Sequence, residues 1–211
     1  MIIKKGAMFG LDARIALAIF GALSVISGAS LYSAIQSANT VKIITQLEEV
    51  KKAVEQFMLD TGSYLPEQAS NSNMMLANNL YENGNNLVGW NGPYIGFNAV
   101  GMNIYISNFL YKAASHEMYY MFMRHSNSSW GGPDATAVSF PTSCTSTNCK
   151  IYIANGWSSG MGPQLSGVFR ALDEEIDGGD GAGDGKIRAI DNGTTYRIYM
   201  ELMPEFIRLN R

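Results

Sequence analysis

A long apolar segment near the amino terminus limits the folds open to this chain more than any other feature. Residues 11 to 35 are almost all apolar, and no charged residue occurs from position 15 to position 41. As a helix rising about 1.5 Å per residue, the uncharged stretch measures roughly 40 Å, which is enough to cross a bilayer. We therefore expect the chain to be inserted in a membrane at some stage.

The flanks of this segment leave three interpretations open. A basic flank, with Lys4 and Lys5, and the small residues Ser27, Gly28 and Ala29 fit a cleaved secretory signal. The second interpretation is an uncleaved signal anchor that holds an extracytoplasmic domain to the membrane. In the third, a peptidase on the cytoplasmic face cuts before the apolar segment, which then becomes the new amino terminus.

The helical pattern continues past the apolar segment and narrows to one stripe. Apolar residues recur at three- and four-residue steps between charged ones, at Val41, Ile44, Leu47, Val50, Val54, Phe57 and Met58. One helix is predicted from about residue 11 to about residue 60, ending at Gly62 ahead of Pro66. A cleaved secretory signal does not predict this continuity.

Three motifs of the chain resemble those of type IV pilins and of the pseudopilins of type II secretion. Residues 18 to 23, Ala-Ile-Phe-Gly-Ala-Leu, resemble the Ala-Ile-Ile-Gly-Ile-Leu core of the pilin amino-terminal helix. Residues 53 to 66 resemble the family's helix end, an Ala-x-x-x-Phe face followed by a Gly-x-Tyr-Pro turn. Residues 89 to 95 resemble its Trp-Gly-x-Pro-Tyr segment.

This resemblance implies proteolytic processing and a charge pair at the new amino terminus. It places Met8 at the first mature position and Asp12 at the fifth, with cleavage after Ala7, or after Gly6 if the cut shifts by one. An unpaired ammonium in lipid is costly, so the Asp12 carboxylate would neutralise the Met8 amine, within one chain or between subunits. The alternative is that Asp12 and Arg14 lie at the headgroups and reach into water.

Behind the helix, the chain is long enough for one head domain of the α+β class. Strand-like segments lie at residues 103 to 110, 117 to 124, 151 to 154 and 195 to 202, and residues 67 to 86 read as a surface loop with a short helix. An antiparallel sheet of about four strands against the helix would give the pilin fold. The expected division is a leader (1–7), a transmembrane or filament-core helix (8–40), its amphipathic half (41–62) and the pilin head (63–211).

The chain has two cysteines, Cys144 and Cys149, separated by four residues. In an extracytoplasmic domain we expect them to form a disulfide that closes a small local loop.

A glycine-rich acidic segment over residues 172 to 187 is the one candidate for metal binding. Counting from Asp180 as the first position of an EF-hand-like loop puts Asp184 fifth and Asp191 twelfth, with Asp177 close by. The third position is alanine and the twelfth is not glutamate. Calcium held by Asp177, Asp180, Asp184 and Asp191 therefore remains one interpretation, and a metal-free acidic turn after a helix over residues 164 to 176 remains the other.

The chain carries no catalytic motif that would indicate an enzyme. Its net charge is −3, and no basic patch indicates nucleic-acid binding. The resemblance implies a subunit that polymerises into a helical filament, held in the inner membrane before assembly with its amino terminus inside. Its implied partners are a prepilin peptidase, an assembly ATPase, a platform protein and further copies of itself. The alternatives are a pseudopilin, or a membrane-anchored calcium-binding or adhesive domain that does not polymerise.

Overall fold

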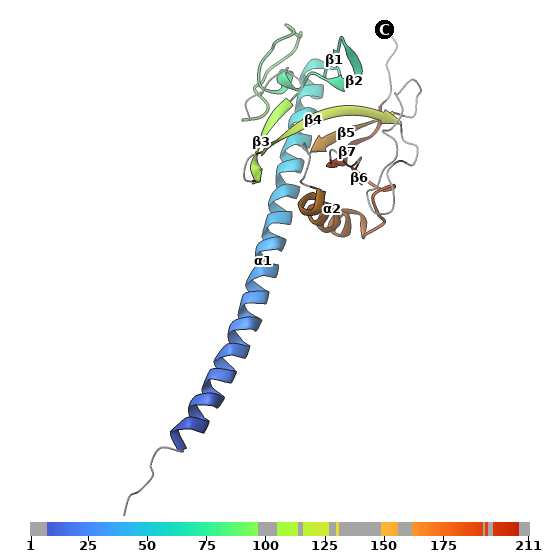
Figure 1. Ribbon diagram of the computed structural model, residues 1–211. Helices are drawn as coiled ribbons and strands as arrows, with labels where there is room; N and C mark the ends of the chain where they lie inside the picture. Colours follow the sequence, from blue (N-terminus) through green and yellow to red (C-terminus); the bar gives the residue numbers. More distant parts are fainter. Residues whose placement is uncertain are drawn as a thin grey trace, which may run out of the picture. The chain divides into compact units, whose positions relative to one another are not determined.

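The computed structural model describes residues 8–96, 105–113, 116–126, 130, 149–155, 162–191, 193 and 196–206. The chain divides into two compact units, residues 1–41 and 42–211. The elements, drawn in Figure 1, are α1 (Met8–Thr61), β1 (Glu67–Gln68), β2 (Asn71–Met75), η1 (Ala77–Leu80), β3 (Tyr105–Ala113), β4 (His116–Ser126), β5 (Cys149–Asn155), α2 (Gly162–Asp177), β6 (Ile187–Asp191) and β7 (Tyr196–Phe206).

The long amino-terminal helix predicted from the sequence is confirmed. α1 covers Met8–Thr61 and ends where a helix end was expected. The Gly62 amide donates a hydrogen bond to the Met58 carbonyl at 2.9 Å, and Gly62 has a φ of 64°. A residue without Cβ adopts this left-handed conformation without strain, which is why the helix stops here.

The head, within residues 42–211, is built on an antiparallel sheet. Its strands follow the order β1-β2-β4-β5-β7-β6, with β3 also paired to β4. One edge of β4 pairs with β5, while the other edge pairs with β3 along its first part and with β2 at Met123. Strands β2 to β7 make a six-stranded sheet, extended by the two-residue β1, so the predicted number of about four strands was too low.

The additional strands were missed for identifiable reasons. β2 reads Asn-Ser-Asn-Met-Met, and polar residues of this kind are uncommon in strands. β6 follows the acidic segment directly, and its residues Ile187–Asp191 fall at the end of the EF-hand-like register considered in the sequence. The interpretation of residues 67 to 86 as a surface loop was therefore wrong for β1 and β2, although its short helix is present as η1.

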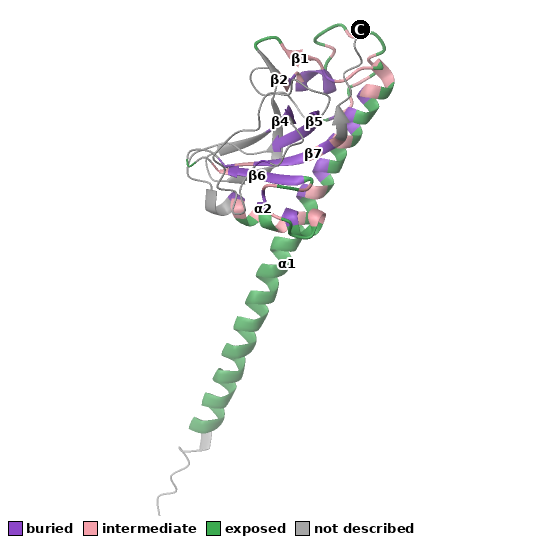
Figure 2. Ribbon diagram, turned by 90° about the vertical axis from the view of Figure 1, so that its right-hand side faces the viewer, coloured by how far each residue is buried: buried purple, intermediate pink, exposed green. Residues whose placement is uncertain are grey.

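One face of the sheet carries the main core of the head. The strands alternate, and the residues on this face pack against the second half of α1 and against α2, which lies where a helix was expected. The buried stripe of α1 is coloured purple in Figure 2. The members of this core on the two helices are Ile43, Leu47, Val50, Ala53, Val54, Phe57, Leu165, Phe169 and Leu172, and those on the central strands include Tyr120, Phe122, Ile151, Ile153, Ile198 and Met200.

The opposite face of the sheet is buried as well. Its cluster consists of Met121, Met123, Trp130, Tyr152, Ala154, Ile190 and Tyr199. The central strands are therefore apolar on both faces, which explains why residues 118 to 123 read as a continuous apolar run in the sequence.

Candidate functional site

The first half of α1 is the most unusual surface of the molecule. Every residue from position 10 to position 39 is exposed, although the segment is predominantly apolar, and Figure 2 shows this part of α1 as exposed throughout. Its exposed large side chains are Leu11, Ile15, Leu17, Ile19, Phe20, Leu23, Val25, Ile26, Leu31, Tyr32 and Ile35. By length and composition, this helix can cross a membrane.

The predicted processing and assembly residues fall at the start of this helix. Gly6 and Ala7 lie outside the described residues. α1 includes Met8 at its first position, so Met8 and Asp12 are four residues, or about one turn, apart along the helix. Asp12 and Arg14 are both exposed. The spacing that the charge pair requires is thus present in the helix.

A group of three carboxylates lies where α2 ends. Asp173 and Asp177 are one helical turn apart on α2, and Asp180 follows on the glycine-rich turn. Each offers an oxygen within 4.8 Å of the others. Gly178 and Gly179 have φ values of 70° and 80°, which turn the chain back so that Asp180 approaches the helix.

Backbone amides bind part of this group. The Asp177 Oδ2 atom accepts hydrogen bonds from the Lys186 and Ile187 amides, at 2.7 Å and 2.6 Å. The Asp173 Oδ2 atom accepts one from the Gly181 amide at 3.1 Å, whereas its buried Oδ1 atom has no hydrogen-bond partner. The acidic group therefore also ties the end of α2 to the start of β6.

The environment of Asp173 favours its neutral form. Asp173 is only 5% exposed, and burial raises the pKa of its carboxyl group. The Gly181 amide lowers that pKa, while the charges of Asp180 and Asp177 raise it further. A buried carboxylate beside two others needs a nearby positive charge, either a proton or a cation.

Only two of the four predicted calcium ligands belong to this group. Asp177 and Asp180 lie in it, and Asp173 joins them in place of Asp184 and Asp191. Asp184 is exposed. The Asp191 Oδ1 atom instead accepts a hydrogen bond from the Gly193 amide at 2.9 Å, at the far end of β6. The sequence signal for Asp173 was its i, i+4 relation to Asp177, because this spacing places two residues on one face of a helix.

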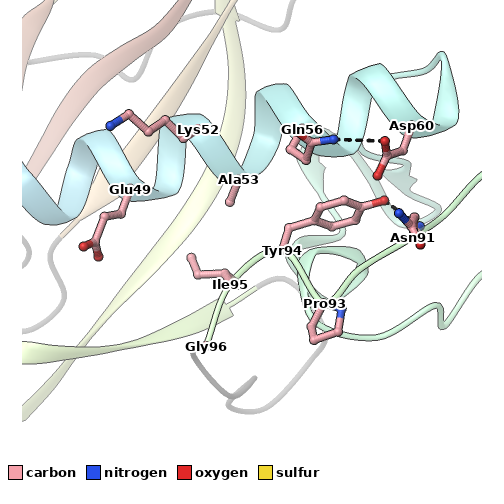
Figure 3. Close-up of a pocket in the computed structure, with 10 residues that line it drawn as sticks. All are labelled: Glu49, Lys52, Ala53, Gln56, Asp60, Asn91, Pro93, Tyr94, Ile95 and Gly96. Atoms are coloured by element: carbon pink, nitrogen blue, oxygen red, sulfur yellow. Dashed lines mark hydrogen bonds between the residues drawn. The ribbon is translucent and has the colours of Figure 1, made fainter.

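A groove of about 770 Å³ lies between the second half of α1 and residues 91 to 96. In Figure 3, the Tyr94 ring lies across from α1, and its hydroxyl accepts a hydrogen bond from the Asn91 amide at 2.8 Å. On α1, Gln56 donates to Asp60 at 3.0 Å. The lining mixes both signs of charge with amides and apolar atoms.

The sheet face opposite the main core holds a cluster of aromatic side chains with polar atoms, which the sequence did not indicate. The rings of His125, Trp130, Tyr152 and Tyr199 have centroids between 4.9 Å and 6.5 Å apart. The Arg188 guanidinium lies 5.0 Å from the Trp130 ring centroid. Burial lowers the pKa of His125 to about 4, and the charge of Arg197 lowers it too. His125 is therefore a neutral core residue at neutral pH.

Of the two cysteines in the predicted disulfide, the structure describes only Cys149. Cys149 is buried at the start of β5 and is disulfide-bonded. The Arg124 guanidinium donates to its sulfur at 3.9 Å and also forms an ion pair with Glu67. The expected partner, Cys144, lies outside the described residues.

Comparisons of the chain with family models, with curated proteins and with solved structures find no match. The long amino-terminal helix and the antiparallel sheet that it packs on are compatible with a pilin-like fold.

Proposed function

We propose that this chain is a pilin-like structural subunit that polymerises into a type IV pilus or a related filament. The observation that carries the proposal is the first half of α1, which is apolar and exposed over residues 10 to 39. The proposal includes a prepilin peptidase that removes residues 1–7, an assembly ATPase and a platform protein. The new amino terminus is a candidate for methylation.

The exposed apolar surface of α1 supports a model in which this helix is covered first by lipid and later by neighbouring subunits. Burying one large apolar side chain contributes about 1.5 to 3 kcal/mol, and apolar residues occur all around this helix rather than along one stripe. Such a surface needs a cover. Lipid supplies that cover before assembly, and the same segments of neighbouring subunits supply it in the filament.

The position of Asp12 supports a role for this residue in setting the axial position of each subunit within the filament. A carboxylate near the start of a lipid-facing helix is costly unless a cation is close. The free ammonium of a processed Met8 is one helical turn away in sequence. Pairing with the amine of a neighbouring subunit would fix the axial position of each new subunit.

The second half of α1 supports a strong link between helix and head. Residues such as Val50, Val54 and Phe57 belong to the main core of the head. Within residues 42–211, the helix thus cannot separate from the sheet without loss of that core. A filament held together by its helices would carry the heads with it.

The first test is the mass and amino-terminal sequence of the protein, purified from its native membrane and from sheared surface material. We expect a chain that starts at Met8, or at Ala7 if the cut shifts by one, and that is present in the sheared fraction. A chain that starts at Met1 and stays in the membrane would contradict the proposal. A chain that starts near Ser30 would make this an ordinary secreted domain.

The acidic group at the end of α2 favours a second candidate, a membrane-anchored calcium-binding or adhesive domain that does not polymerise. This candidate shares the membrane helix with the first and differs in its amino terminus and its oligomeric state. A pseudopilin would share the processing. It would differ in its dependence on a secretion system, which deletion of the secretion genes would reveal.

A further inference from the structure

The groove between the second half of α1 and residues 91 to 96 is large enough for a small ligand. Its volume of about 770 Å³ lies within the range of about 300 to 1,000 Å³ that is usual for such sites. Both walls belong to the head. The polar part of the lining, shown in Figure 3, consists of Glu49, Lys52, Gln56, Asp60, Asn91 and Tyr94.

Several of these polar groups are held in place by the fold. The Gln56 side-chain amide donates a hydrogen bond to Asp60 Oδ1 at 3.0 Å, and the Asn91 backbone amide donates one to the Tyr94 hydroxyl at 2.8 Å. Burial raises the pKa of this hydroxyl, the Asn91 amide lowers it, and the neighbouring Asp60 carboxylate raises it. The Tyr94 ring packs edge-on against Phe57, which is fully buried in the main core. A wall fixed in this way loses little entropy when a ligand binds.

The same wall keeps hydrogen-bonding capacity for a ligand. The buried Oδ2 atom of Asp60 has no hydrogen-bond partner. Gln56 and Asn91 are exposed, and each carries an amide side chain with an acceptor oxygen and N–H donors. Within the described part of the chain, neither Glu49 nor Lys52 takes part in an ion pair. Donors and acceptors thus occur together along the groove.

This mixture of donors and acceptors indicates the class of ligand. A phosphate group accepts hydrogen bonds and needs donors around it, whereas a metal cation needs acceptors. A hydroxyl group both donates and accepts, so a ligand with several hydroxyls can use both kinds of group at once. Tyr94, Pro93 and Ile95 add apolar surface for the CH groups of a sugar ring.

We propose that this groove binds a neutral sugar, one or two rings long. Gln56, Asp60 and Asn91 bind its hydroxyl groups, and Tyr94 packs against a ring. The inference goes beyond the proposed function, because the site lies entirely within residues 42–211 and requires neither processing nor a filament.

The test is saturation-transfer difference NMR on the full-length chain in lauryldimethylamine oxide, a detergent without a sugar headgroup. The probes are lactose, maltose and cellobiose, with glucose 6-phosphate as the anionic comparison. We expect saturable signals from at least one disaccharide and weaker binding of the phosphate. Gln56→Ala should weaken binding about threefold to tenfold, through the loss of hydrogen bonds. Glu55→Ala is the matched control, because Glu55 is the exposed neighbour on α1 and does not line the groove.

Gly96→Phe is a second variant, which obstructs the groove without touching its polar wall. Gly96 is exposed and lines the groove, and a Cβ built on it meets nothing within 4 Å. The larger side chain therefore has room, and we expect it to abolish the signals. Circular dichroism checks that this variant folds.

Three outcomes would overturn the inference. The first is the absence of saturable binding for all three disaccharides. The second is binding that neither Gln56→Ala nor Gly96→Phe changes, which would place the sugar elsewhere. The third is a preference for glucose 6-phosphate, which would indicate an anion site at Lys52. A chain that binds sugar but is neither processed nor assembled would count against the proposed function alone, so the two proposals fail separately.

Discussion

At the scale of single residues, three titratable side chains of this protein are buried or are proposed to enter a membrane, where water is scarce. Asp12 lies near the start of the membrane-length helix α1, Asp173 is buried beside two other acids, and His125 lies among aromatic rings. Each position is costly for a charged group without a partner. Substitutions at these sites should therefore have effects that depend on assembly, on metal or on pH.

The Asp12 carboxylate should be required for assembly and dispensable for folding. Asp12→Asn keeps the size of the side chain and removes its charge, so the proposed pair with the amine of a processed Met8 could not form. We expect filaments in sheared material to be nearly absent, with normal amounts of protein in the membrane. Arg14→Gln is the matched control on the same exposed helix and should still assemble. Equal assembly by both variants would argue against the charge pair.

Acid should destabilise the head through His125. The folded-state pKa of about 4 lies below the ordinary value of 6.5, so the unfolded chain binds the proton more tightly. The stabilisation is complete above pH 6.5 and is lost as the pH falls towards 4. Between pH 7 and pH 5 the loss is about 2 kcal/mol. Denaturant unfolding of the original chain and of His125→Phe at both pH values measures it, since the variant should lack this component. Identical pH dependence would mean that His125 is not the group responsible.

At the scale of elements, the second half of α1 is held by a narrow buried stripe. Phe57 is fully buried and packs edge-on against Tyr94, with ring centroids 5.8 Å apart. Two positions further on, Leu59 is 79% exposed. Phe57→Ala should lower the free energy of unfolding by about 3 to 5 kcal/mol, because it leaves a cavity. Leu59→Ala should change it by about 0.5 kcal/mol or less. Similar losses in denaturant unfolding would mean that the stripe has been assigned to the wrong face.

The two glycines around the end of α1 should differ in their tolerance of a side chain. Gly62 and Gly89 both have positive φ, but a Cβ on Gly62 meets nothing within 4 Å. A Cβ on Gly89 would lie 2.3 Å from the Asp60 carbonyl oxygen. Gly62→Ala should thus cost about 1 to 2 kcal/mol from backbone strain alone. Gly89→Ala should cost distinctly more, and thermal unfolding of the two variants compares them directly.

Elements with a strong period were predictable from the sequence, and elements defined by their neighbours were not. Three elements can be recognised from their own sequence pattern: the apolar stripe of α1, the helical pattern of α2 and the apolar run of β4. β2 is a strand because β4 offers it an edge, although its residues favour turns. Likewise Asp173 completes the acidic group only once the turn at Gly178 and Gly179 brings Asp180 back to the helix. Counting ligand positions along the sequence cannot predict this approach of Asp180 to the helix, because it depends on the folded turn.

At the scale of the whole molecule, the two units should behave as separable parts. All residues of both buried clusters lie between positions 43 and 202. A chain that begins at Lys42 should therefore fold and stay in the aqueous phase of a detergent phase separation, whereas the full chain should enter the detergent phase. Circular dichroism of the shorter chain checks its fold. Partition of both chains into detergent would show that the head itself has a membrane-binding surface.

The loop between α2 and β6 has a consequence for the risk of aggregation. β6 is the last strand in the sheet order, so one of its edges has no neighbouring strand among the described residues. The Ile187 amide is taken by the Asp177 carboxylate and the Ala189 amide by the Ala182 carbonyl, at 2.6 Å and 3.2 Å. Donors that could recruit a strand from another molecule are thus already occupied. Where many heads are crowded together, as in the proposed filament, these occupied donors should disfavour an amyloid-like pairing of β6 with a strand of another head.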